Sequence, residues 1–126
     1  MIDVQKHVAY WKDGAAEDLE VAVDLIAQNR IRHGLFFAHL ALEKMLKAHI
    51  CLHTSDLAPR IHNLIRLAEV AELSLTVDQQ NILADMNAFN IEGRYPNTLT
   101  PVPSLKEAKV YLERTKEVYE WLLSQL

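Results

Sequence analysis

Four charged or titratable side chains lie on one side of the helix predicted around residues 33–53. They are Arg32, His39, Glu43 and Lys47, which helical geometry places within about a third of a turn of one another. Glu43 and Lys47 have the order and spacing of an i, i+4 ion pair, which alone would explain them as surface residues. Apolar residues border this line, so we instead predict a face that meets a second copy of the chain, a partner protein or a ligand. The predicted dimer or partner face consists of Arg32, Phe36, His39, Leu40, Glu43 and Lys47.

The loop GRYPN, residues 93–97, places a guanidinium and a phenol on a turn that Pro96 restricts. Arginine is the side chain best shaped for bidentate capture of a phosphate or carboxylate, so Arg94 is a candidate anion contact. Tyr95 could stack on a base or form a hydrogen bond. The alternative is that Arg94 pairs with an acidic helix face while Tyr95 covers the end of the fold.

Metal and nucleophile chemistry find little support in the sequence. His49 and His53 are four residues apart on one helix, but no carboxylate or third histidine stands at a companion spacing. We therefore expect a core-facing His49, a His53 at the helix end, no metal and no cofactor. Cys51 lies in the same apolar helix, where a small core residue is expected. The three glycines are too far apart for a phosphate-binding or dinucleotide loop.

Composition indicates one all-helical domain spanning residues 1–126. Half of the residues are hydrophobic and only three are glycine. The formal charge of -4 argues against general attraction to nucleic acid or to anionic membranes. A single cysteine, the lack of a long apolar run and the lack of a secretion signal at the start predict a cytoplasmic protein without membrane attachment.

Hydrophobic periodicity and capping signals divide the chain into four longer helices and one shorter helix. The first is expected from Asp3 to about Gln28, and a short turn leads into the apolar helix that ends near Leu52. A shorter helix after Pro59 would carry Ile61 and Leu64 inward, with His62 towards its other side. Two capping-box spacings mark the last two helices, Thr76 with Gln79 and Ser104 with Glu107. The fourth helix is expected to bury Phe89 and to end at Gly93. We predict an antiparallel four-helix up-and-down bundle with an additional short helix.

Three segments, HLALEKMLKAH, PRIHNLIRLAE and FNIEGRYPN, occur in this order. Together they resemble the HEPN family, a family of small helical domains. The most specific parts are Ala41 to Ala48 and Arg94 to Pro96, and the stretch from His62 to Leu64 supports them. The resemblance implies a helical bundle that commonly dimerises and often works beside a small nucleotidyltransferase. In several branches such a pair behaves as a toxin and antitoxin.

Toxic members resemble one another in an Arg, four to six residues, His motif that forms a metal-independent ribonuclease site across the dimer. This chain departs from that pattern, because no histidine follows His62 and nothing can complete the motif after Arg94. Arg32 and His39 have six residues between them but lie in a different element. A ribonuclease would need its imidazole from His39 or His62.

The resemblance therefore favours a non-catalytic HEPN protein. It would form a homodimer that binds a nucleotide or phosphorylated ligand, or serves as the partner of a nucleotidyltransferase, or does both. In this interpretation Arg94 contacts the anion, Tyr95 stacks or donates a hydrogen bond, and His62, Lys44 and Lys47 support them. Two alternatives remain open: a metal-independent endoribonuclease toxin that acts on RNA, and a structural adaptor that only dimerises.

Overall fold

A computed structural model describes residues 2–90 and 101–126, which form helices and contain no strand. The helices are α1 (Val4–Ala27), α2 (Ile31–Thr54), α3 (Leu64–Val70), α4 (Val77–Met86), the short 3-10 helix η1 (Asn87–Phe89) and α5 (Leu105–Ser124). The predicted all-α bundle is confirmed. Among the described residues, no helix is both long enough and apolar enough to cross a membrane.

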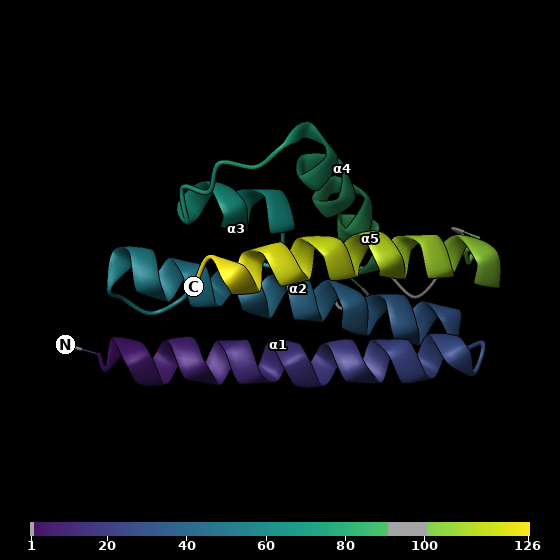
Figure 1. The fold of residues 1–126 in the computed structure, drawn as a ribbon, viewed down its shortest axis with the longest axis horizontal. Coiled ribbons are helices and arrows are strands. Elements are labelled where there is room, and N and C mark those ends of the chain that lie inside the picture. The colour runs from purple at the N-terminus through teal and green to yellow at the C-terminus, as the bar shows by residue number, and fades with distance from the viewer. Residues whose placement is uncertain (1, 91–100) are drawn as a thin grey trace.

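The long helices α1, α2 and α5 lie side by side, and α3 and α4 cover the side of α2 and α5 that faces away from α1 (Figure 1). α1 and α2 run antiparallel. α5 runs in the same direction as α2, so α3 and α4 together provide the return path between them (Figure 1). α2 contacts all four other α-helices, which explains why this helix is apolar around most of its circumference.

A tight turn joins α1 to α2. Asn29 adopts the left-handed region with φ 61, which asparagine tolerates better than most residues. Just beyond the turn, Gly34 lies against the end of α1. A Cβ atom at this position would approach the Ile26 Cγ1 atom to 2.5 Å, so only glycine lets the two helices come this close. The turn and this glycine set the hairpin on which the rest of the molecule packs.

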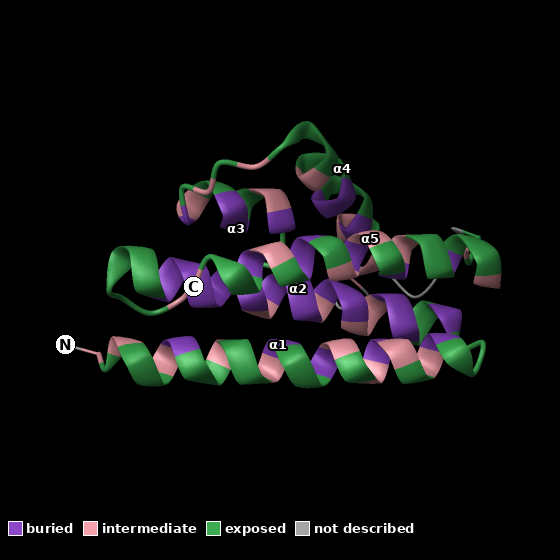
Figure 2. Ribbon diagram, viewed as in Figure 1, coloured by how far each residue is buried: buried purple, intermediate pink, exposed green. Residues whose placement is uncertain are grey.

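The core follows the predicted periodicity. Figure 2 shows α2 buried along most of its length, whereas α1 and α5 alternate between buried and exposed positions. The N-cap at Asp3 and the capping boxes at Thr76 and Ser104 form as expected, each side chain accepting a hydrogen bond from the backbone N–H three residues on. The largest fully buried side chains of α2 are Leu35, Leu42, Met45, Leu46 and Ile50.

Two helix boundaries differ from the sequence prediction. α3 begins at Leu64 because Asn63 caps it, accepting a hydrogen bond from the Arg66 N–H at 3.1 Å. His62 therefore lies in the coil before α3 and not on the helix. α4 ends at Met86 and passes into η1, where Phe89 is only partly buried and packs edge-on against Tyr111. The predicted helix end at Gly93 lies outside the described residues.

Candidate functional site

The carboxylate of Glu43 is the centre of a charged cluster in the middle of α2. Its Oε2 atom accepts a hydrogen bond from the Lys47 Nζ at 3.1 Å, one helical turn along. The Lys47 Nζ also lies 5.2 Å from the centre of the Trp11 ring, which adds a cation–π contact from α1. Both Glu43 and Lys47 are buried. The predicted i, i+4 ion pair thus exists, but inside the chain and not at its surface.

His39 lies one turn before Glu43 and is completely buried. Its Nδ1 atom is 3.1 Å from the Met86 carbonyl oxygen at the end of α4, so Nδ1 donates the hydrogen bond. Its Nε2 atom is 3.3 Å from the Glu43 Oε1, close enough for a charge contact although the N–H is not aligned for a hydrogen bond. Both neighbours of the ring are acceptors, the Met86 carbonyl oxygen on the Nδ1 side and the Glu43 carboxylate on the Nε2 side.

His62 reaches the same carboxylate from the coil before α3. Its Nδ1 atom is 3.1 Å from the Glu43 Oε1, and 49% of its side chain is exposed. Two asparagines fix this region: the Asn87 Oδ1 accepts a hydrogen bond from the Leu64 N–H at 2.8 Å, and the Asn87 amide donates to the Asn63 Oδ1 at 3.2 Å. The cluster therefore joins α2, the start of α3 and the end of α4, and His62 is its exposed end.

The electrostatics of the cluster favour an ionised carboxylate. Burial by itself raises the pKa of Glu43, because it disfavours the charged form. The contact with His39, the charge and hydrogen bond of Lys47, and the hydrogen bond from His62 outweigh burial and lower this pKa from 4.5 to about 2. Glu43 is consequently a negative charge at neutral pH, paired with the Lys47 ammonium and contacted by two imidazole rings.

The other residues of the predicted sites fall in different places. Lys44 pairs with Asp18 of α1, with 2.7 Å between its Nζ and the Asp18 Oδ2, and takes no part in the Glu43 cluster. Arg32 is exposed, and Phe36 and Leu40 are partly exposed, so these three form the surface part of the predicted partner face. His39, Glu43 and Lys47 instead meet the chain's own residues. Arg94 and Tyr95 lie outside the described residues.

The histidine pair on α2 splits between two environments. The His49 Nε2 donates a hydrogen bond to the Leu122 carbonyl oxygen in the last turn of α5, at 2.7 Å, so His49 faces the core as expected. Burial lowers the pKa of His49, and the hydrogen bond to Leu122 opposes this only in part. The His53 Nε2 lies 2.7 Å from the Glu72 Oε2 at the surface. Within residues 2–90 and 101–126, no group of three or more metal-ligating side chains occurs.

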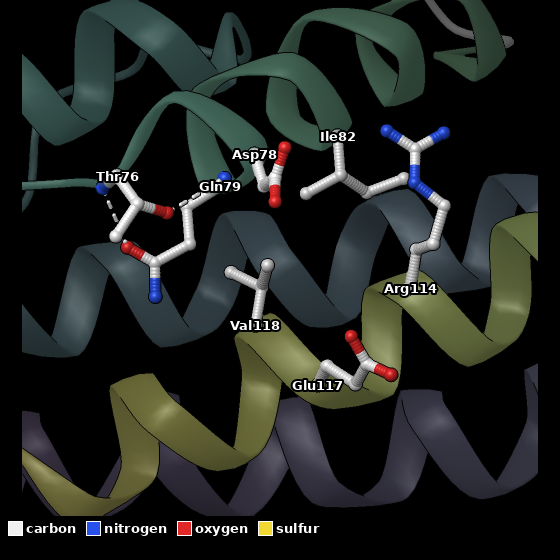
Figure 3. A pocket seen from close by; sticks show the side chains of 7 residues that line it. All are labelled: Thr76, Asp78, Gln79, Ile82, Arg114, Glu117 and Val118. Carbon is white, nitrogen blue, oxygen red and sulfur yellow. Dashed lines mark hydrogen bonds between the residues drawn. The ribbon is translucent and has the colours of Figure 1, made fainter.

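A groove of about 460 Å³ lies between the start of α4 and the middle of α5, away from the Glu43 cluster (Figure 3). Its lining residues are Thr76, Asp78, Gln79, Ile82, Arg114, Glu117 and Val118. The polar groups of Thr76 and Gln79 bond to each other in the capping box, and the Arg114 guanidinium donates to the Asp85 carboxylate at 3.1 Å. With two carboxylates of its own, Asp78 and Glu117, the groove is electrostatically unsuited to a phosphate.

Comparison with known proteins assigns this arrangement to a family. The sequence matches the HEPN domain over residues 8–126, nearly its whole length. The chain is a HEPN-domain protein. Among curated proteins, no relative matches this HEPN protein. The resemblance stated from the sequence motifs is thereby confirmed.

Two solved structures share the fold of this HEPN domain. The crystal structure of TT1696 from Thermus thermophilus superposes with a TM-score of 0.77 at 19% identity, covering 94% of this chain and 98% of TT1696. The crystal structure of ST0689, an archaeal HEPN homologue, gives a TM-score of 0.72 at 18% identity, covering 94% of this chain and 96% of ST0689. At such low identities the likeness shows the fold alone.

Sequence reasoning missed three parts of the cluster in this HEPN domain. No sequence signal placed Trp11 at this site, and neither Asn87 nor the carbonyl of Met86 carries a recognisable signal. The contact between Met86 and His39 spans 47 positions, and that between His62 and Glu43 spans 19. The only usable signal was the motif around His62, which pointed to the residue but not to its carboxylate partner.

Proposed function

We propose that this HEPN domain binds a nucleotide or another phosphorylated ligand without catalysing a reaction, as the partner subunit of a nucleotidyltransferase in a toxin–antitoxin type of module. The observation that carries the ligand part is the exposed end of the Glu43 cluster. His62 is held by a buried carboxylate through its Nδ1 while half of its side chain faces solvent. A histidine fixed in this way is positioned to meet a ligand with its outer ring edge.

The charges of the cluster support an anionic ligand. Lys47 already offsets the single negative charge of Glu43. His39 and His62 both contact the same carboxylate oxygen, so any proton that either ring takes up adds positive charge that no further carboxylate in the described part of the cluster neutralises. A phosphate meeting such a site gains charge-assisted hydrogen bonds. A cluster that has taken up such a proton is locally positive, in contrast to the overall charge of -4.

The same contacts support a binding role over a catalytic one. Ribonuclease chemistry needs a general base, a general acid and a cation near the scissile phosphate. His39 is 0% and Lys47 is 6% exposed, and both are engaged with Glu43. Among the titratable side chains in the described part of the cluster, only His62 is substantially exposed. A single exposed imidazole suits recognition better than acid–base catalysis.

The sequence predictions complete the proposed ligand site. Arg94 is proposed as the bidentate anion contact and Tyr95 as a stacking or hydrogen-bonding group. Lys47 supports the site through Glu43. The pairing of Lys44 with Asp18 makes a direct role of Lys44 in ligand binding secondary in this proposal.

Calorimetric titration of the purified protein with ATP tests the ligand part. We expect saturable binding that Arg94→Ala weakens by at least tenfold, the usual effect of removing a charge-assisted contact. Lys109→Ala, which changes an exposed lysine of α5, serves as the control and should leave the affinity unchanged. Absence of saturable binding at millimolar ATP would remove the ligand part of the proposal.

One observation favours a second candidate, the metal-independent endoribonuclease. A histidine whose Nδ1 is oriented by a carboxylate is the arrangement of a general base in many hydrolytic sites, and His62 with Glu43 has it. Incubation of the protein with RNA in the presence of a chelator tests this candidate. Cleavage that His62→Ala abolishes would replace the binding proposal with the ribonuclease.

The partner proposal rests on the surface residues of α2. Arg32, Phe36 and Leu40 present a mixed charged and apolar strip, and we propose that this strip contributes to a homodimer. Light scattering should give about twice the chain mass at micromolar concentration, and Phe36→Asp should return the protein to a monomer. A wild-type monomer would contradict the proposed dimer. Co-purification with a co-expressed nucleotidyltransferase encoded beside it would test the second partner.

A further inference from the structure

The ring of His62 has two different edges. Because a carboxylate oxygen only accepts, the contact of 3.1 Å with the Glu43 Oε1 requires that the Nδ1 atom of His62 carry a hydrogen. The neutral ring then has a lone pair at Nε2, whereas the protonated ring has an N–H there. Nε2 makes no hydrogen bond to any residue that the structure describes, and the side chain is 49% exposed. Protonation therefore changes the outer edge from an acceptor into a charged donor.

The groups around His62 include one carboxylate and its partners. Glu43 faces it directly, and behind Glu43 lie Lys47 and His39 from the same helix. From the other elements, α1 contributes the uncharged Trp11 ring beside Lys47, and the end of α4 contributes the Met86 carbonyl bonded to His39. The neighbouring Asn63 and Asn87 bond to each other and carry no charge.

Lys47 and Glu43 neutralise each other, so a proton on His62 leaves positive charge at a half-exposed position. A phosphate oxygen brought to Nε2 would compensate that charge, and Glu43 would continue to hold Nδ1. The neutral ring offers the same oxygen only a lone pair, which repels it. Histidine changes its charge between pH 5 and 8, so this difference acts in the physiological range.

We infer that the phosphorylated ligand binds on the Nε2 edge of protonated His62, so that binding takes up one proton from solvent and weakens as pH rises. This inference rests on the proposed function, since it assigns a contact and a pH dependence to the proposed ligand site. Glu43 is a positioning residue in it: it holds Nδ1 without touching the ligand.

The test compares ATP affinities of wild type and His62→Gln by calorimetry from pH 6 to pH 8.5. The terminal phosphate of ATP itself titrates near pH 6, so the quantity to examine is the ratio of the two affinities at each pH. We expect wild type to bind at least tenfold more tightly than His62→Gln at pH 6, and the two to converge by pH 8.5. Repeating the titration in buffers of different ionisation enthalpy should reveal greater proton uptake by wild type than by His62→Gln.

His53→Gln is the matched control, because His53 is a partly exposed histidine that contacts the carboxylate of Glu72 at 2.7 Å. It should bind ATP with the wild-type affinity and pH profile. Glu43→Gln keeps the shape of the side chain and removes the charge that holds Nδ1, so the pH profile of ATP binding should differ from that of wild type. Circular dichroism identifies any variant that has not folded, and the His62→Gln comparison still decides the question if Glu43→Gln fails to fold.

Two negative results are distinguishable. Absence of saturable ATP binding at every pH overturns the proposed ligand binding, and this inference with it. Saturable binding with the same affinity ratio between wild type and His62→Gln at all pH values, or with no loss in His62→Gln, overturns this inference alone. In that case the ligand-binding proposal stands without His62.

Discussion

Two histidine–carboxylate contacts join different segments of this protein, and we expect the longer one to contribute more to stability. His62 and Glu43 lie 3.1 Å apart, and Glu43 has a side-chain exposure of 7%. His53 and Glu72 lie only 2.7 Å apart, but the Glu72 side chain is 73% exposed. Water screens the surface pair, whereas the buried carboxylate depends on its neighbours for all of its stabilisation. Burial of the carboxylate, and not the distance, separates a structural centre from a surface contact.

The difference in burial between Glu43 and Glu72 should have its largest effect on stability. This effect should appear when each carboxylate is removed. Glu43→Ala leaves Lys47 buried without its counter-charge and removes the carboxylate beside the buried His39, so we expect a loss of about 3–5 kcal/mol in the free energy of unfolding. Glu72→Ala should change it by no more than about 0.5 kcal/mol. Urea denaturation of both variants measures the difference. Equal losses would mean that burial does not distinguish the two contacts.

The pH dependence should show the same contrast. The pKa of Glu43 is lowered from 4.5 to about 2, so the unfolded chain binds a proton at this residue at higher pH than the folded chain does. The resulting stabilisation, about 3 kcal/mol, is complete above about pH 5 and is lost as pH falls towards 2.

Urea denaturation of wild type and Glu43→Gln at pH 6.5 and pH 3 tests this dependence. The stability gap between them should shrink by about 2 kcal/mol at pH 3. The corresponding gap for Glu72→Gln should stay constant within about 0.5 kcal/mol. A gap for Glu43→Gln that persists at pH 3 would show that the charge of Glu43 is not what stabilises the fold.

A smaller loss of stability is expected when Lys47, the cationic partner of Glu43, is replaced. Lys47→Met keeps the aliphatic stem against Trp11 but takes away the full positive charge that contacts the Glu43 Oε2 atom. We expect a loss of about 2 kcal/mol, because His39 and His62 continue to contact the other carboxylate oxygen.

Lys44→Met provides the comparison for Lys47→Met. Lys44 also pairs with a carboxylate of low exposure, Asp18, but its own side chain is 30% exposed, so the expected loss is about 1 kcal/mol. Thermal or urea unfolding of the two variants in the same buffer measures which substitution costs more stability. A greater loss for Lys44→Met would place the more important ion pair between α1 and α2 and not in the Glu43 cluster.

Local features of the fold could be predicted from the sequence, whereas the long-range contacts could not. Helix caps depend on residues three positions apart, which is why Thr76 with Gln79 and Ser104 with Glu107 form as predicted. The sequence prediction did not recognise Asn63 as a helix cap. It therefore began the third helix too early and placed His62 on it. The helix period also predicted that His39, Glu43 and Lys47 are neighbours on α2, because residues four positions apart lie on the same side of a helix.

What covers that polar line could not be predicted from periodicity. A polar line bordered by apolar residues has the same sequence pattern whether it packs against a second protein or against a distant part of the same chain. Here the neighbours of His39 and Glu43 come from the end of α4 and the coil before α3. Only the tertiary arrangement reveals that Met86, Asn87 and His62 meet at this point.

The smallest expected effect on stability is the most informative about function. His62→Gln and His53→Gln each remove a partly exposed imidazole, and we expect each to change the free energy of unfolding by about 0.5 kcal/mol or less. If ligand binding depends on His62, the two variants will be alike in urea denaturation and unlike in ATP titration. A purely structural His62 would show the reverse, with a measurable loss of stability and unchanged affinity. Because Glu43 keeps Lys47 and His39 as partners when His62 is replaced, a loss of binding in a fully stable protein has to arise at the exposed ring edge itself.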